Sequence, residues 1–339
     1  MPLRIVTTGS RGFIGSVFSL RAVERGHTVL ALDDESRGEN PIEQKIGGSY
    51  HKHDCKTGFH DLVSELAPRT RVDVVAHFAA ATGSLDRPLE ELLELNVEMT
   101  KHVYEDALRL GARCFLWPTT SLALGVPDSP YVESKERALA MLKTVDAKAK
   151  ISTPLRFFNV AGAYKDLSEL RKNEVHLIPE IVRAAAQRFE LIINGDDYDT
   201  IDGTPSRDFV HVFDVVEYLL DIAEAQIAGA KIAVPHPDDG AIWLGKGVST
   251  TVREAIDIYQ TATGNTVPIQ IGPRRPFDCG SLQVDIRQAA QFAMIRGGLA
   301  PAWVSIRDEA AALAGRHRAW RGETVSGEID TQAALASSY

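Results

Sequence analysis

The sequence contains few cysteines, no basic cluster and no long apolar run. Its three widely spaced cysteines, Cys55, Cys114 and Cys279, fit neither a disulfide framework nor a zinc site, and they suit a reducing compartment. Acidic residues outnumber basic ones by 46 to 37, which argues against nucleic acid as a partner. No apolar stretch has the length of a membrane span. An anionic ligand would therefore be held locally, by a few arginines, lysines and helix N-termini.

The N-terminal stretch LRIVTTGSRGFIGSVFSLRAVERGHTVLALDD is the most regular part of the chain. An apolar strand follows Met1 almost directly, so we expect no signal peptide and a cytoplasmic protein. A glycine-rich turn, a helix over Phe13–Glu24 and a second apolar run come next. Together they predict a strand–helix–strand unit.

Strands and helices keep alternating after this unit. DVVAHFAA, RCFLWPTT and TPLRFFNVAG predict strands, whereas LEELLELNVEMTKHVYEDALRLG and Tyr131–Val145 predict helices. This order predicts an α/β fold with a Rossmann-type, doubly wound parallel sheet that helices cover on both faces. We expect residues 1–162 to form this nucleotide-binding domain and 163–320 to form a smaller α/β substrate-binding lobe. About 207–245 would return to the first domain, and 321–339 would be a loosely held polar tail.

Three glycines follow the first predicted strand in the pattern G-x-x-G-x-x-G: Gly9, Gly12 and Gly15. The first glycine permits a tight turn, the second lets the backbone approach a pyrophosphate, and the third lets the helix pack closely on the strand. The helix N-terminus would then face the phosphates. A plain glycine-rich turn is the alternative, but the position between a strand and a helix favours a dinucleotide site.

Asp33 ends the second predicted strand, where an acid can bond a ribose 2′-hydroxyl and repel a 2′-phosphate. This favours NAD over NADP. Arg11 in the glycine turn and Arg37 after the strand could soften that preference, or both could be solvated surface residues. Asp54, after the third predicted strand, could meet the adenine or be an ordinary loop acid.

Tyr131 and Lys135 lie four residues apart on one face of a predicted helix. A tyrosine at its ordinary pKa of about 10 is a poor base, but a neighbouring ammonium group and a cationic nicotinamide would both favour the phenolate. Such a tyrosine could take a proton from a sugar hydroxyl. The preceding strand end, WPTTS, offers Thr119, Thr120 and Ser121 as a hydroxyl partner.

These motifs resemble the extended short-chain dehydrogenase/reductases (NAD-dependent epimerases/dehydratases), and within them the UDP-glucose 4-epimerases. TGSRGFIGS, HFAA, SPYVESK and LRFFNVAGA are similar to the whole superfamily. HLIPEIVRAA, NGDDYDTIDGTPSRDFVHVFDV and WLGKGVSTTVREAIDIYQTATGNTVPIQIGPRRPFD look like the epimerases in particular. The resemblance runs from Leu3 to about Leu313. It implies NAD as cofactor, a UDP-sugar as substrate and a homodimer that packs through the two long predicted helices.

The resemblance also implies roles for individual residues. Thr120, Tyr131 and Lys135 match the catalytic residues. The NAD site would comprise Gly9, Gly12, Phe13, Ile14, Gly15, Asp33, Asp54, Cys55, His77, Phe78, Ala79, Ala80, Asn96, Tyr131, Lys135 and Phe158. The UDP-sugar would be held by Thr120, Asn159, His176, Leu177, Arg207, Arg275 and Asp278. For Arg207 and Arg275, forked binding of the pyrophosphate competes with an ordinary surface or ion-paired role.

The reaction that the resemblance implies is inversion at C4 of a UDP-hexose through a 4-keto sugar. The sequence departs from the epimerase pattern in a shortened stretch after HFAA, at Leu124, in the short loop VPDSP and at Leu282. These changes bear on which sugar is accepted, so another UDP-sugar, N-acetylated, uronic or a pentose, is an alternative.

A sugar-nucleotide dehydratase would carry an acid pair directly after the catalytic threonine, where this chain has Ser121 and Leu122. A decarboxylase is disfavoured by the same absence. A non-catalytic dinucleotide-binding protein would typically lack the tyrosine or the lysine. His77, His211 and the run His51–His53 lack spaced partners of metal-ligand type, so we expect them to be structural and no metal to be bound.

Overall fold

The computed structural model describes residues 1–47, 49–67, 71–82, 87–126, 128–170, 176–275 and 278–320. The chain divides into two compact units. Unit 1 comprises Met1–Phe157 and Val216–Leu244, and unit 2 comprises Phe158–Val215 and Gly245–Tyr339. The chain thus crosses between the units three times, after Phe157, Val215 and Leu244, where the sequence predicts a boundary at 162 and a returning segment at about 207–245. That each unit serves one ligand stays a prediction.

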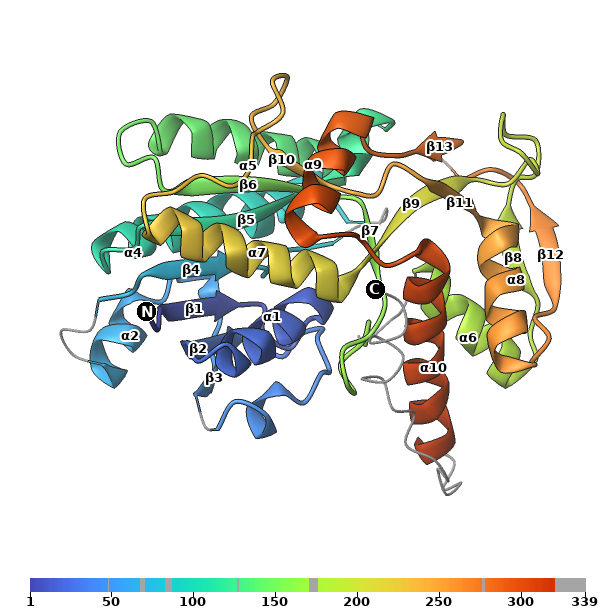
Figure 1. Ribbon diagram of the computed structural model, residues 1–339, viewed down its shortest axis with the longest axis horizontal. Coiled ribbons are helices and arrows are strands. Elements are labelled where there is room, and N and C mark those ends of the chain that lie inside the picture. Colours follow the sequence, from blue (N-terminus) through green and yellow to red (C-terminus); the bar gives the residue numbers. More distant parts are fainter. Residues whose placement is uncertain are drawn as a thin grey trace. The chain divides into compact units, whose positions relative to one another are not determined.

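Unit 1 is built on a seven-stranded sheet with the order β10-β6-β5-β4-β1-β2-β3. All its paired strands are parallel, so their carboxyl ends meet at one edge. The order reverses between β4 and β1, where open α/β sheets bind ligands. The strands are β1 (Arg4–Thr8), β2 (Thr28–Asp33), β3 (Tyr50–Lys52), β4 (Val74–His77), β5 (Cys114–Thr120), β6 (Ser152–Phe157) and β10 (Ile242–Leu244) (Figure 1).

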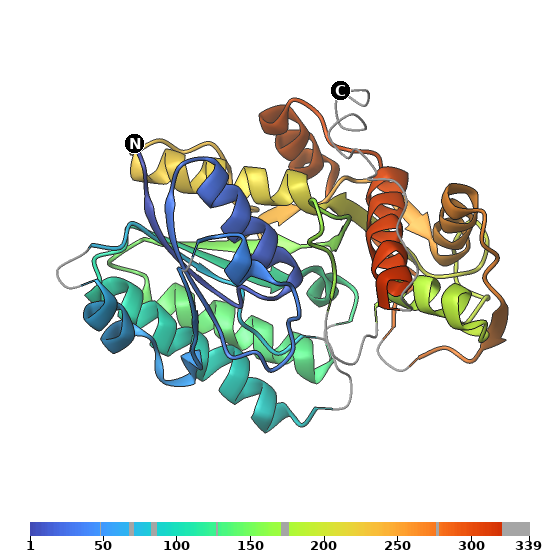
Figure 2. The same ribbon diagram turned by 90° about the horizontal axis from the view of Figure 1, so that it is seen from below.

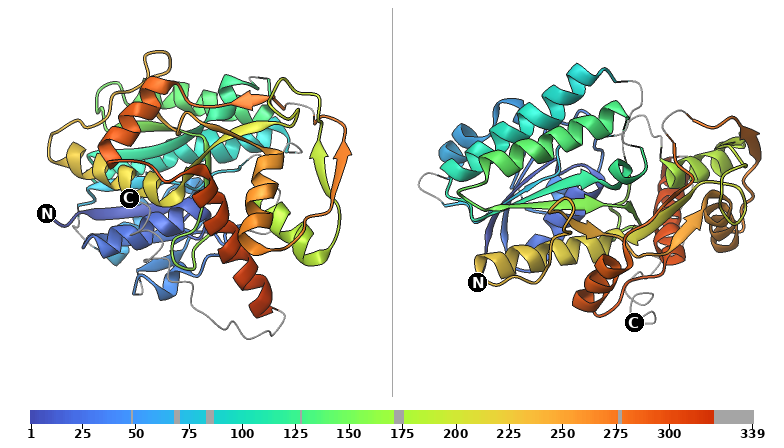
Figure 3. Two further views of the ribbon diagram at one scale, coloured as in Figure 1. Left: turned by 45° about the vertical axis from the view of Figure 1, so that its right-hand side comes forward. Right: turned by 90° about the horizontal axis from the view of Figure 1, so that it is seen from above.

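Helices cover both faces of this sheet, as the alternation in the sequence predicts. Figures 2 and 3 show α1 and α7 on one face, and α2, α4 and α5 on the other. The helices are α1 (Phe13–Glu24), α2 (His60–Leu66), α3 (Leu89–Leu93), α4 (Met99–Arg109), α5 (Pro130–Val145) and α7 (Val212–Ile227), of which the first four residues belong to unit 2. Apolar side chains of α2, α4 and α5 form one buried cluster with β4 and β5. The α/β fold with a parallel, doubly wound sheet is therefore confirmed.

The local sequence explains where the helices of unit 1 begin. The Ser129 side chain accepts a hydrogen bond from the backbone of Val132, and Pro130 occupies the first turn of α5, so this helix starts one residue before Tyr131. The predicted long helix runs without a break from Leu89 to Arg109, but it is not α-helical throughout. A π-helical segment (Glu94–Glu98) separates α3 from α4, and such segments are frequent at functional sites.

Unit 2 contains shorter strands and a separate core. The strand β9 is central, since it pairs with β7, β11 and β13, while β8 pairs with β12. Its strands are β7 (Asn159–Ala161), β8 (Leu191–Asn194), β9 (Ser206–His211), β11 (Ser249–Thr251), β12 (Ile269–Gly272) and β13 (Ser281–Leu282). Its helices are α6 (Leu177–Gln187), α8 (Val252–Thr263), α9 (Ile286–Arg296) and α10 (Ala302–Trp320). Apolar faces of α6, α8 and α10 share one buried cluster with β8 and β9.

Short 3-10 helices complete the described elements: η1 (Ile42–Gln44), η2 (Cys55–Thr57) and η4 (Ser121–Leu124). The predicted polar tail, 321–339, lies outside the described residues, as does part of the shortened stretch after HFAA. Within the described part of the chain, no helix combines the length and the apolar character that crossing a bilayer requires.

Candidate functional site

The glycine turn between β1 and α1 is tightly packed by backbone alone. Gly9 has a φ of +70°, and a Cβ there would come within 2.5 Å of the backbone nitrogen of Ala79. A Cβ at Gly15 would come within 2.2 Å of the carbonyl oxygen of Gly9. Each position thus excludes any side chain, so the first and third glycines of the motif are explained by close backbone approach.

This turn has the features of a pyrophosphate cradle. Gly12 is the N-cap of α1, and no side chain caps the first turn, which contains Phe13, Ile14 and Gly15 and no acid. The first backbone N–H groups of a helix attract anions when no side chain uses them. A Cβ at Gly12 would lie 3.2 Å from the Gly9 carbonyl, tighter than ordinary contact. The residues present therefore fit a dinucleotide phosphate.

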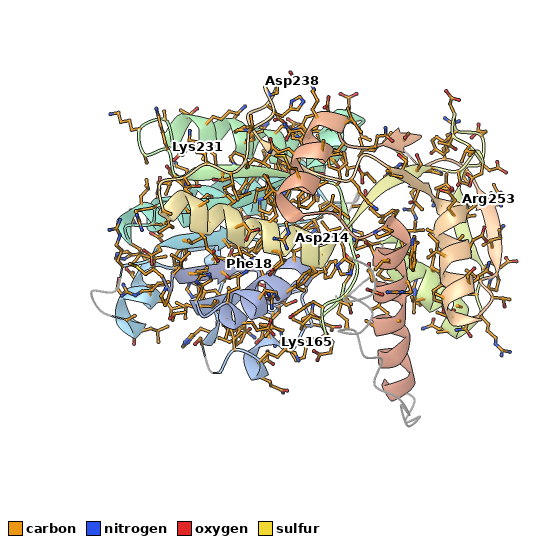
Figure 4. The ribbon with its side chains drawn as sticks, viewed as in Figure 1. Phe18, Lys165, Asp214, Lys231, Asp238 and Arg253 are labelled. Carbon is orange, nitrogen blue, oxygen red and sulfur yellow. The ribbon has the colours of Figure 1, made fainter. Side chains whose placement is uncertain are left out.

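The loop after β4 packs against the glycine turn. The ring of Phe18 on α1, labelled in Figure 4, meets the ring of Phe78 edge to face, with 5.3 Å between the centroids. The backbone N–H of Ala79 donates to Thr8 Oγ1 at 3.3 Å. The predicted cofactor residues Phe78, Ala79 and Ala80 are thus held beside the glycine turn by β1 and α1.

Asn96 fixes the same loop from the π-helical segment. Its amide oxygen accepts from the backbone N–H of Ala81 at 2.9 Å, and its amide nitrogen donates to the carbonyl of Ala81 at 3.1 Å and to Ser134 Oγ at 2.9 Å. Ser134 Oγ in turn donates to the carbonyl of Tyr131 at 2.7 Å. The side chain of Asn96 therefore ties the loop after β4 to α5, one residue before Lys135.

Asp33 is buried at the end of β2 and is held by two backbone N–H groups. Its Oδ2 accepts from Arg11 at 2.9 Å and its Oδ1 accepts from Glu35 at 2.8 Å. Burial raises the pKa of this carboxyl, and the two backbone hydrogen bonds oppose that rise. The carboxylate thus lies at the carboxyl edge of the sheet, directly beside the glycine turn, as the predicted ribose contact requires.

Asp54 and Cys55 follow β3 on the same edge. Asp54 caps the short helix η2, and its Oδ1 accepts from the backbone of Lys56 at 2.9 Å. Cys55 is buried, and burial raises the pKa of its thiol, so the group stays neutral. That these two residues contact adenine stays a prediction.

Lys135 is the most unusual charge of unit 1. Only 4% of its surface is exposed, its Nζ lies 4.7 Å from the centroid of the Trp117 ring, and no carboxylate among the described residues pairs with it. Burial lowers its pKa from the ordinary 10.5 to about 7. Because burial destabilises the ammonium form, Lys135 can donate hydrogen bonds to an arriving ligand or can lose its proton near neutral pH.

His77 lies close enough to Lys135 to be affected by its charge, and it is fully occupied. Its two ring nitrogens form hydrogen bonds with Thr8 Oγ1 at 2.7 Å and Thr100 Oγ1 at 3.1 Å. Burial, assisted by Lys135, lowers its pKa to about 3, so the imidazole is neutral. Among the described residues, no group of three or more His, Cys, Asp or Glu side chains could hold a metal ion.

Thr120 ends β5 and begins η4. Its Oγ1 accepts from the backbone N–H of Leu122 at 3.2 Å, and its carbonyl accepts from the buried Arg156. Arg156 also donates to Glu136 Oε1 at 3.1 Å and to Asp239 Oδ2 at 2.6 Å. Since Glu136 follows Lys135 on α5, Arg156 links Thr120 to the helix that carries Tyr131 and Lys135. The hydroxyl of Thr119 is inaccessible to solvent, so it is a poorer candidate for contact with a ligand.

In unit 2 the predicted UDP-sugar residues lie on several segments. Asn159 begins β7 and pairs in register with Phe209 of β9, two residues after Arg207. His176 precedes α6 and its Nδ1 lies 2.6 Å from Glu169 Oε1, and Leu177 opens that helix. Arg275 is exposed. Phe158, which was predicted for the NAD site, also lies in unit 2 and is buried beside Gly245.

Arg207 and Asp278 are brought together. Arg207 Nη2 donates to Asp278 Oδ1, and its Nη1 donates to the carbonyls of Ser206 at 2.8 Å and Cys279 at 3.0 Å. Leu282 is the register partner of Arg207 on β13 and is buried. The guanidinium is thus ion-paired, as the alternative prediction had it. A bound pyrophosphate would have to share it or displace Asp278.

Several contributing residues were not found from the sequence. The ring of Trp117 lies against Lys135, Ser134 accepts a hydrogen bond from Asn96, and Arg156 donates to the carbonyl of Thr120. The two residues of each of these pairs are far apart in the chain. Only the hydrogen bond between Ser134 and Tyr131 is local. The one sign of these residues in the sequence is the arginine in LRFF, a charged residue in the middle of a predicted apolar strand. A charge in such a position requires partners.

Comparisons with known proteins identify a family and similar proteins. The model of the NAD dependent epimerase/dehydratase family matches residues 5–234. A UDP-glucose 4-epimerase of Corynebacterium glutamicum is 28% identical over 311 residues, which cover 85% of this chain and 89% of that protein.

Solved structures share the fold of most of the chain. The UDP-glucose 4-epimerase from Brucella ovis in complex with NAD has a TM-score of 0.80 and 26% identity, covering 92% of this chain and 98% of that one. The UDP-glucose-4-epimerase from Stenotrophomonas maltophila, with bound NAD and formylated UDP-arabinopyranose, also has a TM-score of 0.80, at 23% identity, and covers 94% of this chain and 99% of that one.

Proposed function

The chain belongs to the NAD dependent epimerase/dehydratase family, and from this premise we propose that it is a UDP-hexose 4-epimerase interconverting UDP-galactose and UDP-glucose with bound NAD. The curated relative from Corynebacterium glutamicum and the structure from Brucella ovis both have the name UDP-glucose 4-epimerase. Their similarity supports the reaction class more strongly than the identity of the sugar.

In this proposal unit 1 holds the cofactor. The N-terminus of α1 and the glycine turn bind the pyrophosphate, and Asp33 accepts a hydrogen bond from a ribose hydroxyl. Bound NAD supplies the chemistry of reversible oxidation at C4 of the sugar. Lys135 donates to the nicotinamide ribose, a contact that would restore the solvation its ammonium group lacks in the buried site.

Tyr131 acts as the base, taking the proton from O4 as the alcohol is oxidised and returning it when the ketone is reduced from the other face. Thr120 donates a hydrogen bond to the same oxygen and fixes its orientation. The charge of Lys135 favours the phenolate form of Tyr131. In unit 2, Arg207 and Arg275 hold the pyrophosphate of the UDP-sugar, and Asn159, His176, Leu177 and Asp278 complete that site.

The buried lysine carries the proposal. A lysine side chain that is 96% buried, lies over Trp117 and has no acid partner among the described residues is costly to maintain. This lysine lies four residues after Tyr131 on α5, next to the strand end that carries Thr120. A catalytic role explains why such an unfavourable burial is kept. A structural lysine would be exposed or paired with a carboxylate.

The sugar is the open choice within this proposal. Epimerisation of an N-acetylhexosamine, a uronic acid or a pentose on UDP uses the same chemistry, and the short loop before α5 and Leu282 would act on the size of the sugar. A dehydratase fits less well, because Ser121 and Leu122 follow Thr120 and neither can act as the acid that expels water.

A homodimer is the partner that the family resemblance implies, packed through α4 and α5. The large apolar residues of these helices belong mostly to the core of unit 1, with Leu108 and Val145 as the exposed exceptions. Light scattering on the purified protein would measure the oligomeric state directly.

The direct test of the reaction is conversion of UDP-galactose without added NAD⁺ and, in parallel, with it. We expect UDP-glucose from the wild type and a decrease of about 10²–10⁴-fold in kcat for Tyr131→Phe. Tyr104→Phe is the matched control, because it removes a tyrosine hydroxyl of the same unit that donates to Asp146 instead. Absence of conversion across UDP-galactose and a panel of N-acetyl, uronic and pentose UDP-sugars would refute a 4-epimerase.

A further inference from the structure

The sequence leaves open whether Arg11 weakens the preference for NAD, and the contacts of Arg11 in the structure bear on this question. The backbone N–H of Arg11 donates to Asp33, so its side chain starts beside the proposed ribose contact. An arginine in such a place is the group that accommodates the 2′-phosphate of NADP in dinucleotide-binding folds. Arg11 alone would therefore work against the discrimination that Asp33 provides.

Two carboxylates face this guanidinium. Arg11 Nη1 lies 3.4 Å from Glu43 Oε1 on η1 and 3.6 Å from Glu35 Oε1 in the loop after β2. Only 20% of the arginine side chain is exposed, so solvent screens these pairs incompletely. Nη1 of the guanidinium is thus paired with acids before any ligand arrives, while its buried Nε has no hydrogen-bond partner among the described residues.

Glu35 is held in this position by further contacts. Tyr50 Oη donates to Glu35 Oε1 at 2.9 Å, and Lys52 Nζ lies 3.0 Å from Glu35 Oε2. Hydrogen bonds from Lys52 and Tyr50 lower the pKa of the Glu35 carboxyl, so it is an anion at neutral pH. Glu35 also adopts a φ of +62°, which is uncommon for a residue other than glycine. The ion pairs of its carboxylate with Arg11 and Lys52 offset this backbone strain.

We propose that Glu35 and Glu43 determine the preference for NAD over NADP by neutralising Arg11, which would otherwise bind a 2′-phosphate. Asp33 and Asp34 add repulsion from the same loop, and Arg37 and Lys52 are the other cations there. This inference rests on the cofactor site of the proposed function. It concerns nucleotide binding alone, so it does not depend on which sugar is turned over.

The test measures the ratio of bound NADP⁺ to bound NAD⁺. Each protein is equilibrated with an equimolar mixture, washed, denatured to release its nucleotides, and analysed by chromatography. Removing one acid a few ångströms from a phosphate of charge near −2 is worth roughly a fivefold change in affinity. We expect the ratio to rise roughly tenfold or more in Glu35→Gln/Glu43→Gln, with bound NAD⁺ little changed.

Two further variants make the result specific. Glu39→Gln removes an exposed acid of the same loop for which no ion pair is found among the described residues, and it should leave the ratio within twofold of the wild type. Adding Arg11→Ala to the double variant should cancel at least half of the gain on a logarithmic scale, because the released arginine is its main source.

The outcomes separate this inference from the proposed function. If the double variant unfolds at the wild-type temperature and keeps the wild-type ratio, the inference is wrong while NAD binding stands. A parallel loss of both nucleotides in the double variant would also overturn it, since the acids would then only support the loop. A wild-type protein that binds neither nucleotide would refute the proposed cofactor site itself, and the single variant Glu43→Gln repeats the test if the double variant is unstable.

Discussion

The two proposed ligand regions hold their charged residues in different ways. At the carboxyl edge of the sheet in unit 1, Lys135 is buried without an acid among the described residues, and Asp33 is held by backbone N–H groups. In unit 2, Arg207 is paired with Asp278 and with two backbone carbonyls. Unit 1 thus leaves a cation short of partners, whereas unit 2 satisfies its cation internally.

This difference fits two kinds of ligand contact. A buried cation without an acid can gain a partner and change a neighbour's proton affinity, which suits chemistry. A paired arginine can exchange one anion for another, which suits binding of a phosphate that must also leave.

Lys135→Met should reduce kcat by at least about 100-fold, since it removes the charge beside the proposed base. Lys143→Met on the same helix replaces an exposed lysine and should leave kcat within twofold. Steady-state turnover of a UDP-sugar measures both. Equal kcat values for the two variants would mean that the buried lysine has no catalytic role. The proposed contrast between the units would then be wrong.

The same variant should change how stability depends on pH. Because the pKa of Lys135 is lowered from 10.5 to about 7 in the folded protein, the unfolded chain binds the extra proton between these values. The buried charge therefore destabilises the folded protein fully below pH 7, and the free energy of unfolding rises as pH increases from 7 towards 10.5. Denaturant unfolding at several pH values should show this rise reduced in Lys135→Met.

Gly9→Ala tests how rigidly unit 1 builds its turn. The new Cβ would meet the backbone of Ala79 at 2.5 Å, so we expect a loss of roughly 2–5 kcal/mol in stability and loss of bound NAD. Gly26→Ala is the control, since Gly26 also has a positive φ, of +84°, but no atom within 4 Å of its Cβ position. It should cost only about 1–2 kcal/mol. Similar losses in thermal unfolding would mean that strain, not close approach, explains Gly9.

Arg207→Lys should raise KM for the UDP-sugar about tenfold with kcat changed less than threefold, because a lysine cannot form the fork that binds phosphate. Bound NAD should not change. Arg287→Lys replaces an exposed arginine of α9 that pairs with the N-cap residue Asp285, and it should leave KM unchanged. A fall in kcat with constant KM would place Arg207 in the chemistry and undo the division of roles.

Local patterns predicted local structure well. The helix Phe13–Glu24 has the bounds its apolar spacing predicts, and α5 begins one residue before Tyr131 because Pro130 fits the first turn. The π-helical segment was missed, because its cause is not local. Asn96 bonds to the loop after β4 and to Ser134, and those residues become its neighbours only when the sheet is formed.

Local sequence patterns specify the glycine turn, the alternation that makes the parallel sheet, and the spacing of Tyr131 and Lys135 on one helix face. These follow from steric limits and from periods of a few residues. Which charges are paired depends on the three-dimensional fold. Lys135 lies over Trp117, Arg207 pairs with Asp278, and Arg11 faces Glu35 and Glu43. Burial and charge pairing depend on segments that are distant in the chain, so spacing alone cannot specify them.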